Sequence, residues 1–125
     1  MNIKSLCISL VMVLCVPILA TAKPVLTVYT YESFASEWGP GPAIEKAFEE
    51  HCGCDLEFIA LDSSIGILGR VQLEGSASKA DIVLGLDTNL MTTARQTGLF
   101  ASHGTSLAGR TALPVPFKDD VFVPF

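Results

Sequence analysis

The chain has 125 residues, enough for one small domain, and its formal net charge of −5 argues against nucleic acid as a partner. Acidity mildly favours a cationic ligand, although many soluble proteins are acidic for solubility alone. After residue 22 the sequence contains no Lys/Arg cluster, internal repeat, low-complexity tract or second long apolar run.

Residues 1–22 have the pattern of a secretory signal peptide. Lys4 supplies the positive start, an apolar run extends over Leu6–Leu19, and Ala20-Thr21-Ala22 fits a small-x-small cleavage site. A transmembrane anchor is the alternative, but the run is short for a bilayer and has Pro17 near its end. We therefore predict cleavage after this segment and export from the cytoplasm.

The first element after the signal segment is a predicted strand, Val25–Tyr31, which is rich in β-branched and aromatic residues that alternate. Gly39-Pro40-Gly41-Pro42 prevents its continuation. Tyr31 and Trp38 lie next to two glutamates in this stretch. In an open α/β sheet, ligands bind at the carboxyl ends of the strands, and aromatic faces beside carboxylates suit a flat cation. The sequence therefore predicts a binding loop here.

A helix is expected next, with Pro42 at its first position and Gly53 as a left-handed cap. Three apolar residues recur at helical spacing and are predicted to pack on the sheet: Ile44, Ala47 and Phe48. His51 falls in the last turn, where a cation interacts favourably with the helix dipole, so a structural role is preferred to a catalytic one.

Cys52 and Cys54 are the cysteines that remain after the signal segment. In an oxidising compartment they are expected to form a local disulfide around Gly53 or to stay as inert thiols. A thioredoxin-type site needs two intervening residues at a helix start, and a metal site needs more ligands than these two and His51. We predict neither redox catalysis nor a metal site.

The second strand is predicted to start at Leu56 and to alternate its side chains between the two faces of the sheet. One face receives Leu56, Phe58 and Ala60, and the other receives Ile59 and Leu61.

Asp62-Ser63-Ser64 follows this strand and has two compatible interpretations. The side chains can cap a helix that runs through Leu73 and stops at Glu74-Gly75-Ser76. The hydroxyls of Ser63 and Ser64, with free backbone N–H groups at the helix start, can also contact a ligand. Capping is the favoured role.

Ala80–Leu86 is a short apolar run typical of a buried parallel strand whose two faces are covered by helices. Asp87 follows at its carboxyl end, where it can cap a helix over Leu90–Thr97 or present a carboxylate to a ligand. The sequence does not decide between these roles. Gly98 is expected to end the helix.

Leu99 and Phe100 are expected to pack beneath the helices, and Ala101–Pro116 is predicted to be an irregular loop in which the sequence offers no partner for His103. A charged turn leads into Val121–Phe125, which has the pattern of one more strand beginning. A β-α-β-α-β order followed by an unfinished strand predicts an α/β domain that stops before it is complete.

Several long motifs resemble the periplasmic thiamine-binding proteins of bacterial ABC transporters. They are Lys23–Pro42, Cys52-Gly53-Cys54, Ala80–Leu90 and Thr97–Phe100. Members of that family are considerably longer and have the architecture of type 2 periplasmic binding proteins, in which two α/β lobes close on thiamine or its phosphates. The resemblance implies that residues 23–125 are an incomplete N-terminal lobe, a truncated three-layer α/β unit.

The resemblance also implies roles for single residues. Tyr31 and Trp38 match aromatics that the family places around the ligand rings, in agreement with the attraction between aromatic faces and the thiazolium cation of thiamine. The loop after the second strand departs from the family, because Ser63 and Ser64 occupy positions that usually hold an acid and a glycine. Asp62, one residue earlier, is a candidate substitute for that acid.

For the intact protein the resemblance implies capture without chemistry. Thiamine, or a thiamine phosphate, is the transported ligand in the periplasm, no cofactor is needed, and the closed monomer docks on an inner-membrane permease driven by a cytoplasmic ATPase. An enzyme is not expected, because the sequence has no Gly-rich phosphate loop, no His-x-x-x-His pair and no nucleophile beside a base. The alternatives are a truncated remnant that binds no ligand, and a secreted interaction module, in which the last strand would leave an open edge.

Overall fold

The computed structural model describes residues 22–104 and 119–124, so residues 1–21 of the predicted signal segment and most of the loop that ends at Pro116 lie outside the described residues. The elements are, in chain order, β1 (Val25–Tyr31), α1 (Glu32–Ala35), α2 (Gly41–Cys52), β2 (Asp55–Leu61), α3 (Ser64–Glu74), the 3-10 helix η1 (Gly75–Ala77), β3 (Ile82–Val83) and α4 (Met91–Gln96). Within the described residues, no helix has both the length and the apolar character needed to cross a membrane.

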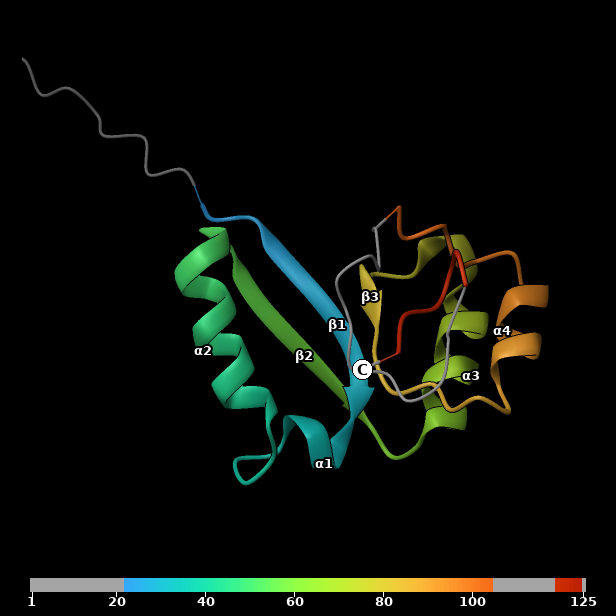
Figure 1. Ribbon diagram of the computed structural model, residues 1–125, viewed down its shortest axis with the longest axis horizontal. Coiled ribbons are helices and arrows are strands. Elements are labelled where there is room, and N and C mark those ends of the chain that lie inside the picture. The colour runs from blue at the N-terminus through green and yellow to red at the C-terminus, as the bar shows by residue number, and fades with distance from the viewer. Residues whose placement is uncertain (1–21, 105–118, 125) are drawn as a thin grey trace, which may run out of the picture.

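β1 is the central strand of a parallel sheet with the order β2-β1-β3 (Figure 1). Its whole length pairs with β2, from Val25 opposite Asp55 to Tyr31 opposite Leu61. The bounds of β1 and the position of β2 agree with the sequence prediction. Because all three strands run in the same direction, their carboxyl ends meet at one edge of the sheet.

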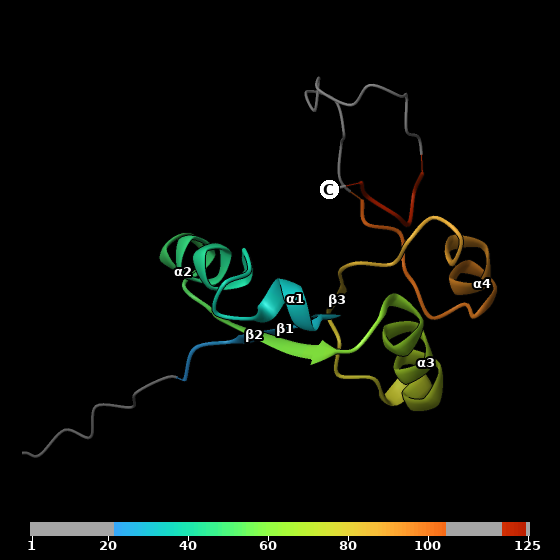
Figure 2. The same ribbon diagram turned by 90° about the horizontal axis from the view of Figure 1, so that it is seen from below.

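Helices cover both faces of the sheet (Figure 2). α1 lies on one face, where the rings of Phe34 and Phe58 meet edge to face with their centroids 5.6 Å apart. α3 lies on the opposite face and packs on β1 and β2. The result is the three-layer α/β arrangement that the sequence predicted.

The core beneath α3 is built around Tyr29, which is fully buried against Ile67 and Val71. The Tyr29 hydroxyl donates to Glu74 Oε2 at 2.8 Å, and the Arg70 guanidinium lies 4.7 Å from the centroid of the Tyr29 ring. Hydrogen bonds from Arg70 and Tyr29 lower the pKa of the Glu74 carboxyl. Two residues of β2 join this cluster on the predicted face: Ile59 and Leu61.

α2 does not pack its apolar face on the sheet as predicted, since Ile44 is 45% exposed and Phe48 43% exposed. Glu49 Oε1 instead accepts the backbone N–H of Leu56 at 2.7 Å, on the side of β2 that faces away from β1. α2 therefore runs beside the outer strand and covers its free edge rather than a face of the sheet (Figure 1). Its C-terminus is capped as predicted, because Gly53 has the left-handed φ of 63°.

β3 is shorter and more exposed than the buried strand predicted over Ala80–Leu86. Ile82 and Val83 alone have strand geometry, and Ile82 is 46% exposed. Gly85 has a φ of 99°, which turns the backbone away from the sheet soon after the strand begins. The apolar character of the run indicated a strand but not where it ends.

α4 lies within the range predicted for the last helix, and Gly98 follows it with the left-handed φ of 69°. Phe100 packs against the core cluster as expected. Leu99, by contrast, is 37% exposed, so only one of the two residues after the helix contributes to the core.

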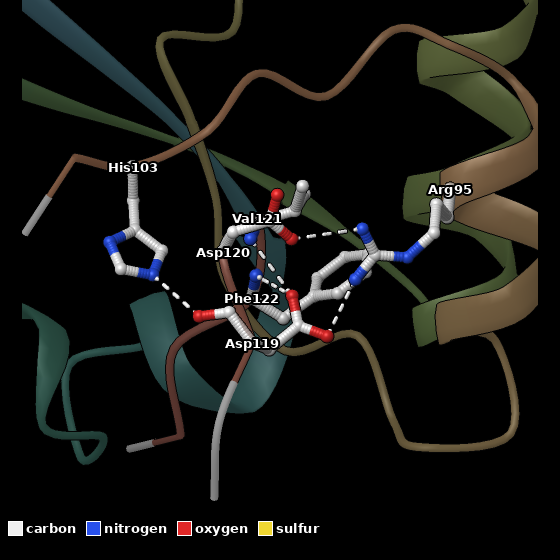
Figure 3. A network of polar contacts seen from close by, with 6 residues as sticks. All are labelled: Arg95, His103, Asp119, Asp120, Val121 and Phe122. Atoms are coloured by element: carbon white, nitrogen blue, oxygen red, sulfur yellow. Dashed lines mark hydrogen bonds and ion pairs between the residues drawn. The ribbon is translucent and has the colours of Figure 1, made fainter.

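The segment predicted to begin a strand at Val121 is a loop. Described residues 119–124 have no strand geometry and fold against α4 (Figure 3). Asp119 Oδ1 accepts the backbone N–H groups of Val121 at 2.8 Å and Phe122 at 2.9 Å. This turn held by a side chain competes with an extended strand, which explains why the prediction is wrong.

Arg95 ties that loop to α4. Its guanidinium donates to Asp119 Oδ2 at 2.6 Å and to Asp120 Oδ1 at 3.1 Å, and it lies 5.4 Å from the centroid of the Phe122 ring (Figure 3). His103, for which the sequence offered no partner, has Nε2 3.1 Å from the carbonyl oxygen of Asp119. Its backbone N–H donates to the carbonyl oxygen of Asp120 at 2.9 Å.

We expect Ile67→Ala to lower the free energy of unfolding by about 2–5 kcal/mol, because it leaves a cavity beside Tyr29 in the core. Ile65 is a matched control on the same helix, since it is 69% exposed while Ile67 is fully buried. Ile65→Ala should change the stability by less than about 0.5 kcal/mol. Urea denaturation of both variants checks the prediction, and equal losses would contradict the assignment of this core.

We expect the loop after residue 118 to become less stable in acid. Hydrogen bonds from the backbone N–H groups of Phe122 and Val121, and then the interaction with Arg95, lower the pKa of Asp119 to about 2. Since this pKa lies below the ordinary value, the stabilisation is present above about pH 4 and is lost as the pH falls towards 2.

Asp119→Asn should therefore be less stable than the wild type at neutral pH, and the difference should disappear near pH 2 in urea titrations. Asp120 is the matched control, because it is largely exposed and contacts the same arginine. A stability difference that does not change with pH would contradict the role of the Asp119 charge.

Candidate functional site

Three segments lie at the carboxyl edge of the sheet: residues 32–40 after β1, which include α1, residues 62–63 after β2 and residues 84–90 after β3. Every ligand-binding residue proposed from the sequence lies in these loops or at the residue adjoining them. Parallel pairing brings the loops to one edge. This edge is therefore the candidate site.

Tyr31 is held at the end of β1 by two contacts. Its ring meets Phe34 edge to face with the centroids 5.9 Å apart. Gly85 lies against the ring edge formed by Cδ1 and Cε1, so closely that a Cβ atom at Gly85 would overlap these carbons. The ring is thereby fixed in orientation, and it is half-buried.

Ser64 connects the start of α3 to the loop after β3. Its hydroxyl donates to the carbonyl oxygen of Gly85 at 2.5 Å. Ser64, Gly85 and Tyr31 therefore form one contact unit across all three strands, which the sequence prediction did not specify. The Ser64 proton is used within the chain, so this residue positions the loop after β3, and its contact with a ligand stays a prediction.

Ser63 is the N-cap of α3, as the sequence favoured. Its hydroxyl oxygen accepts the backbone N–H of Gly66 at 3.1 Å, and its proton is donated to Asp62 Oδ1 at 3.0 Å. Asp62 Oδ1 also lies against Gly66, where a Cβ atom would overlap it. The three residues form an interlocked cap at the first turn of α3.

Trp38 lies in the loop between α1 and α2 and is 79% exposed. The structure records no contact between Trp38 and Tyr31. An exposed tryptophan can meet a ligand with its face, and the residue stays a candidate on that ground.

Asp87 is also exposed, and its Oδ1 accepts the backbone N–H of Asn89 at 2.9 Å. The N-cap of α4 is Leu90, without a side-chain cap, so Asp87 shapes the turn before the helix and does not cap α4 itself. Its role towards a ligand stays a prediction.

The charges of these loops have one sign. Residues 32–40, 62–66 and 84–90 contain no Lys or Arg. They contain four carboxylates, namely Glu32, Glu37, Asp62 and Asp87. Aromatic residues in segments whose charges are all negative favour a cationic ligand over an anionic one.

Gly85 and Gly66 are the positions in the packing of the candidate site that reasoning from the sequence missed. Gly85 interrupts an apolar run, and a glycine there signals a close backbone approach or a bulge. That signal was available for Gly85. Nothing in the sequence marks Gly66, because its role depends on where the Asp62 carboxylate lies.

At the opposite end of the sheet, Cys52 and Cys54 are joined as a disulfide with a sulfur–sulfur distance of 2.00 Å. His51 Nδ1 lies 2.8 Å from the carbonyl oxygen of Ala47, in the last turn of α2. Among the described residues, no group of three or more His, Cys, Asp or Glu side chains is arranged to hold a metal ion.

The chain is similar to curated proteins named thiamine-binding periplasmic proteins. The relative from Salmonella typhimurium is 56% identical over 108 residues, which are 85% of this chain and 32% of the relative. The Escherichia coli relative is 50% identical over 119 residues, 95% of this chain and 36% of the relative. The Haemophilus influenzae relative is 43% identical over 108 residues. This chain thus spans about a third of the length of these relatives. No known family model matches it.

The chain is also similar in fold to solved structures. A periplasmic thiamin binding protein superposes with a TM-score of 0.76 at 53% identity, over 82% of this chain and 32% of that protein. A Trichodesmium protein (IdiA, FutA), solved with iron and citrate, superposes with a TM-score of 0.56 at 20% identity, which shows a shared fold alone.

The three-layer unit with its parallel sheet is therefore a periplasmic binding protein fold. Over the third of their length that it spans, the chain is similar in sequence and in fold to proteins named thiamine-binding periplasmic proteins.

We expect Gly85→Ala to lower the free energy of unfolding by about 1–3 kcal/mol, because a Cβ atom meets the Tyr31 ring and the backbone has a positive φ. Gly69 in α3 is the matched control, since a Cβ atom there meets nothing within 4 Å. Gly69→Ala should stabilise the chain by about 0.5–1 kcal/mol. Thermal and urea denaturation measure both effects, and a neutral Gly85→Ala would contradict the close contact.

Proposed function

We propose that this chain provides one wall of a periplasmic thiamine site in the solute-binding component of an ABC transporter. The observation that supports this most is the contact unit of Tyr31, Ser64 and Gly85 at the carboxyl edge of the sheet. It fixes an aromatic ring at an edge whose segments carry four carboxylates and no Lys or Arg, in a chain 56% identical to a protein named for thiamine binding. The thiazolium cation of thiamine suits that environment.

Each residue in the proposal has a distinct role. Tyr31 and Trp38 offer ring faces to the cation, each contact stabilising the complex by roughly 0.5–2 kcal/mol. Ser63 and Ser64 arrange the first turn of α3, and their remaining lone pairs can accept hydrogen bonds from the ligand. Asp87 offers a carboxylate. Thiamine is bound as cargo, with no chemistry and no cofactor.

The location and partners follow from the same proposal. The names of the relatives place those proteins in the periplasm. Residues 1–22 would then be removed on export, and the ligand-bound protein, acting as a monomer, would deliver thiamine or a thiamine phosphate to an inner-membrane permease.

Titration with thiamine tests the proposal, with the emission of Trp38 as the reporter because it is the single tryptophan of the chain. We expect a saturable change in emission. In calorimetric titrations, Tyr31→Ala and Trp38→Ala should each weaken binding by about two- to thirtyfold, which corresponds to one lost cation–π contact.

Phe48→Ala is the matched control, because Phe48 is an exposed aromatic on α2, away from the carboxyl edge. It should leave the thiamine affinity unchanged. A folded sample that shows no saturable response to thiamine would overturn the proposal and favour the alternative of a chain that binds no ligand.

A further inference from the structure

The first turn of α3 is already occupied by a carboxylate of this chain. Asp62 Oδ1 lies against Gly66 and accepts the hydroxyl proton of Ser63, which in turn accepts the Gly66 N–H. A negative charge at a helix N-terminus interacts favourably with the helix dipole. The place where an incoming anion would bind therefore has a fixed negative charge.

The hydroxyl protons of the two serines at this first turn are also committed. The hydroxyl proton of Ser63 goes to Asp62, and that of Ser64 goes to the carbonyl oxygen of Gly85. Among the described residues, Oδ2 of Asp62 and Oδ2 of Asp87 have no recorded partner, so the edge keeps acceptors available. The first turn of α3 can therefore receive ligand N–H groups and cations, while its two serine hydroxyls have no proton left to donate to a phosphate.

The loop charges act in the same direction. Segments 32–40, 62–66 and 84–90 hold four carboxylates and no Lys or Arg. A phosphate at this edge would approach like charges without a cation to pair with, which is unfavourable.

We propose that Asp62 is a specificity-determining residue that excludes phosphate and other anions from the first turn of α3. This inference rests on the proposed thiamine site and deepens it. The carboxyl edge receives the cationic, hydrogen-bond-donating part of the ligand, and any phosphate ester of that ligand must point away from α3. Gly66 is required for this arrangement, because any side chain there would displace the Asp62 carboxylate.

The test is a titration of the ¹⁵N-labelled chain with inorganic phosphate at neutral pH, observing the backbone amides of Ser64, Ile65 and Gly66. In the wild type these amides should show no saturable shift. In Asp62→Asn, which keeps the shape and an acceptor oxygen, they should shift saturably, because the substitution removes the negative charge that opposes an anion at this helix terminus.

Two variants control for charge and for shape. Asp55→Asn removes the same charge at the amino end of β2, where Asp55 pairs with Lys23, and should leave the three amides unresponsive. Asp62→Glu keeps the charge and should also exclude phosphate. Saturable shifts in the wild type, or a folded Asp62→Asn whose amides do not respond, would overturn the exclusion role.

Titrations with thiamine and with its phosphate ester distinguish a failure of this inference from a failure of the proposed function. Calorimetric titrations measure the affinities for thiamine and for thiamine monophosphate. In Asp62→Asn the affinity for the monophosphate should rise relative to that for thiamine. In Asp55→Asn the ratio of the two affinities should equal that of the wild type. If no variant binds thiamine but the phosphate shifts appear as expected, the proposed function fails while the exclusion role stands. If thiamine binds but Asp62→Asn leaves the ratio of the affinities for thiamine and for its monophosphate unchanged, the exclusion role fails and the proposed function stands.

Discussion

The hydrogen bonding of β1 on both of its edges is the constraint on which the rest of the structure depends. β2 pairs with the full length of β1, and β3 pairs with Val28 and Tyr29 on the other side. Because all three strands are parallel, each connection must cross back over the sheet, which places α1 and α3 on opposite faces and gathers the three following loops at one edge. The strand therefore fixes both the core beneath α3 and the place where a ligand can be bound.

Close packing at that edge relies on small residues and shared hydrogen bonds. Gly85 lets the backbone approach the Tyr31 ring, and Ser64 holds Gly85 there through its carbonyl oxygen. Gly66 gives the Asp62 carboxylate its place in the same way. The candidate site is thus pre-organised, since contacts within the chain already fix the position of the aromatic ring and of the carboxylate.

Local signals in the sequence were sufficient where short-range chemistry decides the structure. The strand over Val25–Tyr31, the Ser63 cap and the left-handed Gly53 follow from residue type and spacing, and the structure agrees. Errors occurred where tertiary contacts override local pattern. Glu49 bonds the outer edge of β2 and leaves Ile44 exposed, and Asp119 turns a β-branched segment into a loop.

In the candidate site, too, some features could be predicted from the sequence and others depend on tertiary contacts. Parallel strand ends predicted which loops meet, because topology alone brings Tyr31, Ser64 and Asp87 to one edge. Composition could not predict which of them touch. The contact between Ser64 and Gly85 spans 21 residues of sequence, and the position of the Asp62 carboxylate depends on the rotation of its side chain over the first turn of α3.

The disulfide between Cys52 and Cys54 encloses a single residue, Gly53. A covalent ring this small removes few conformations from the unfolded chain, in contrast to a cross-link between distant segments. Its effect is therefore confined to the reverse turn that joins α2 to β2, which it holds closed against local fraying. A reducing agent should accordingly increase amide exchange at this turn while the sheet keeps its protection, so the redox state of the surroundings affects one end of the sheet and leaves the candidate site at the opposite end unchanged.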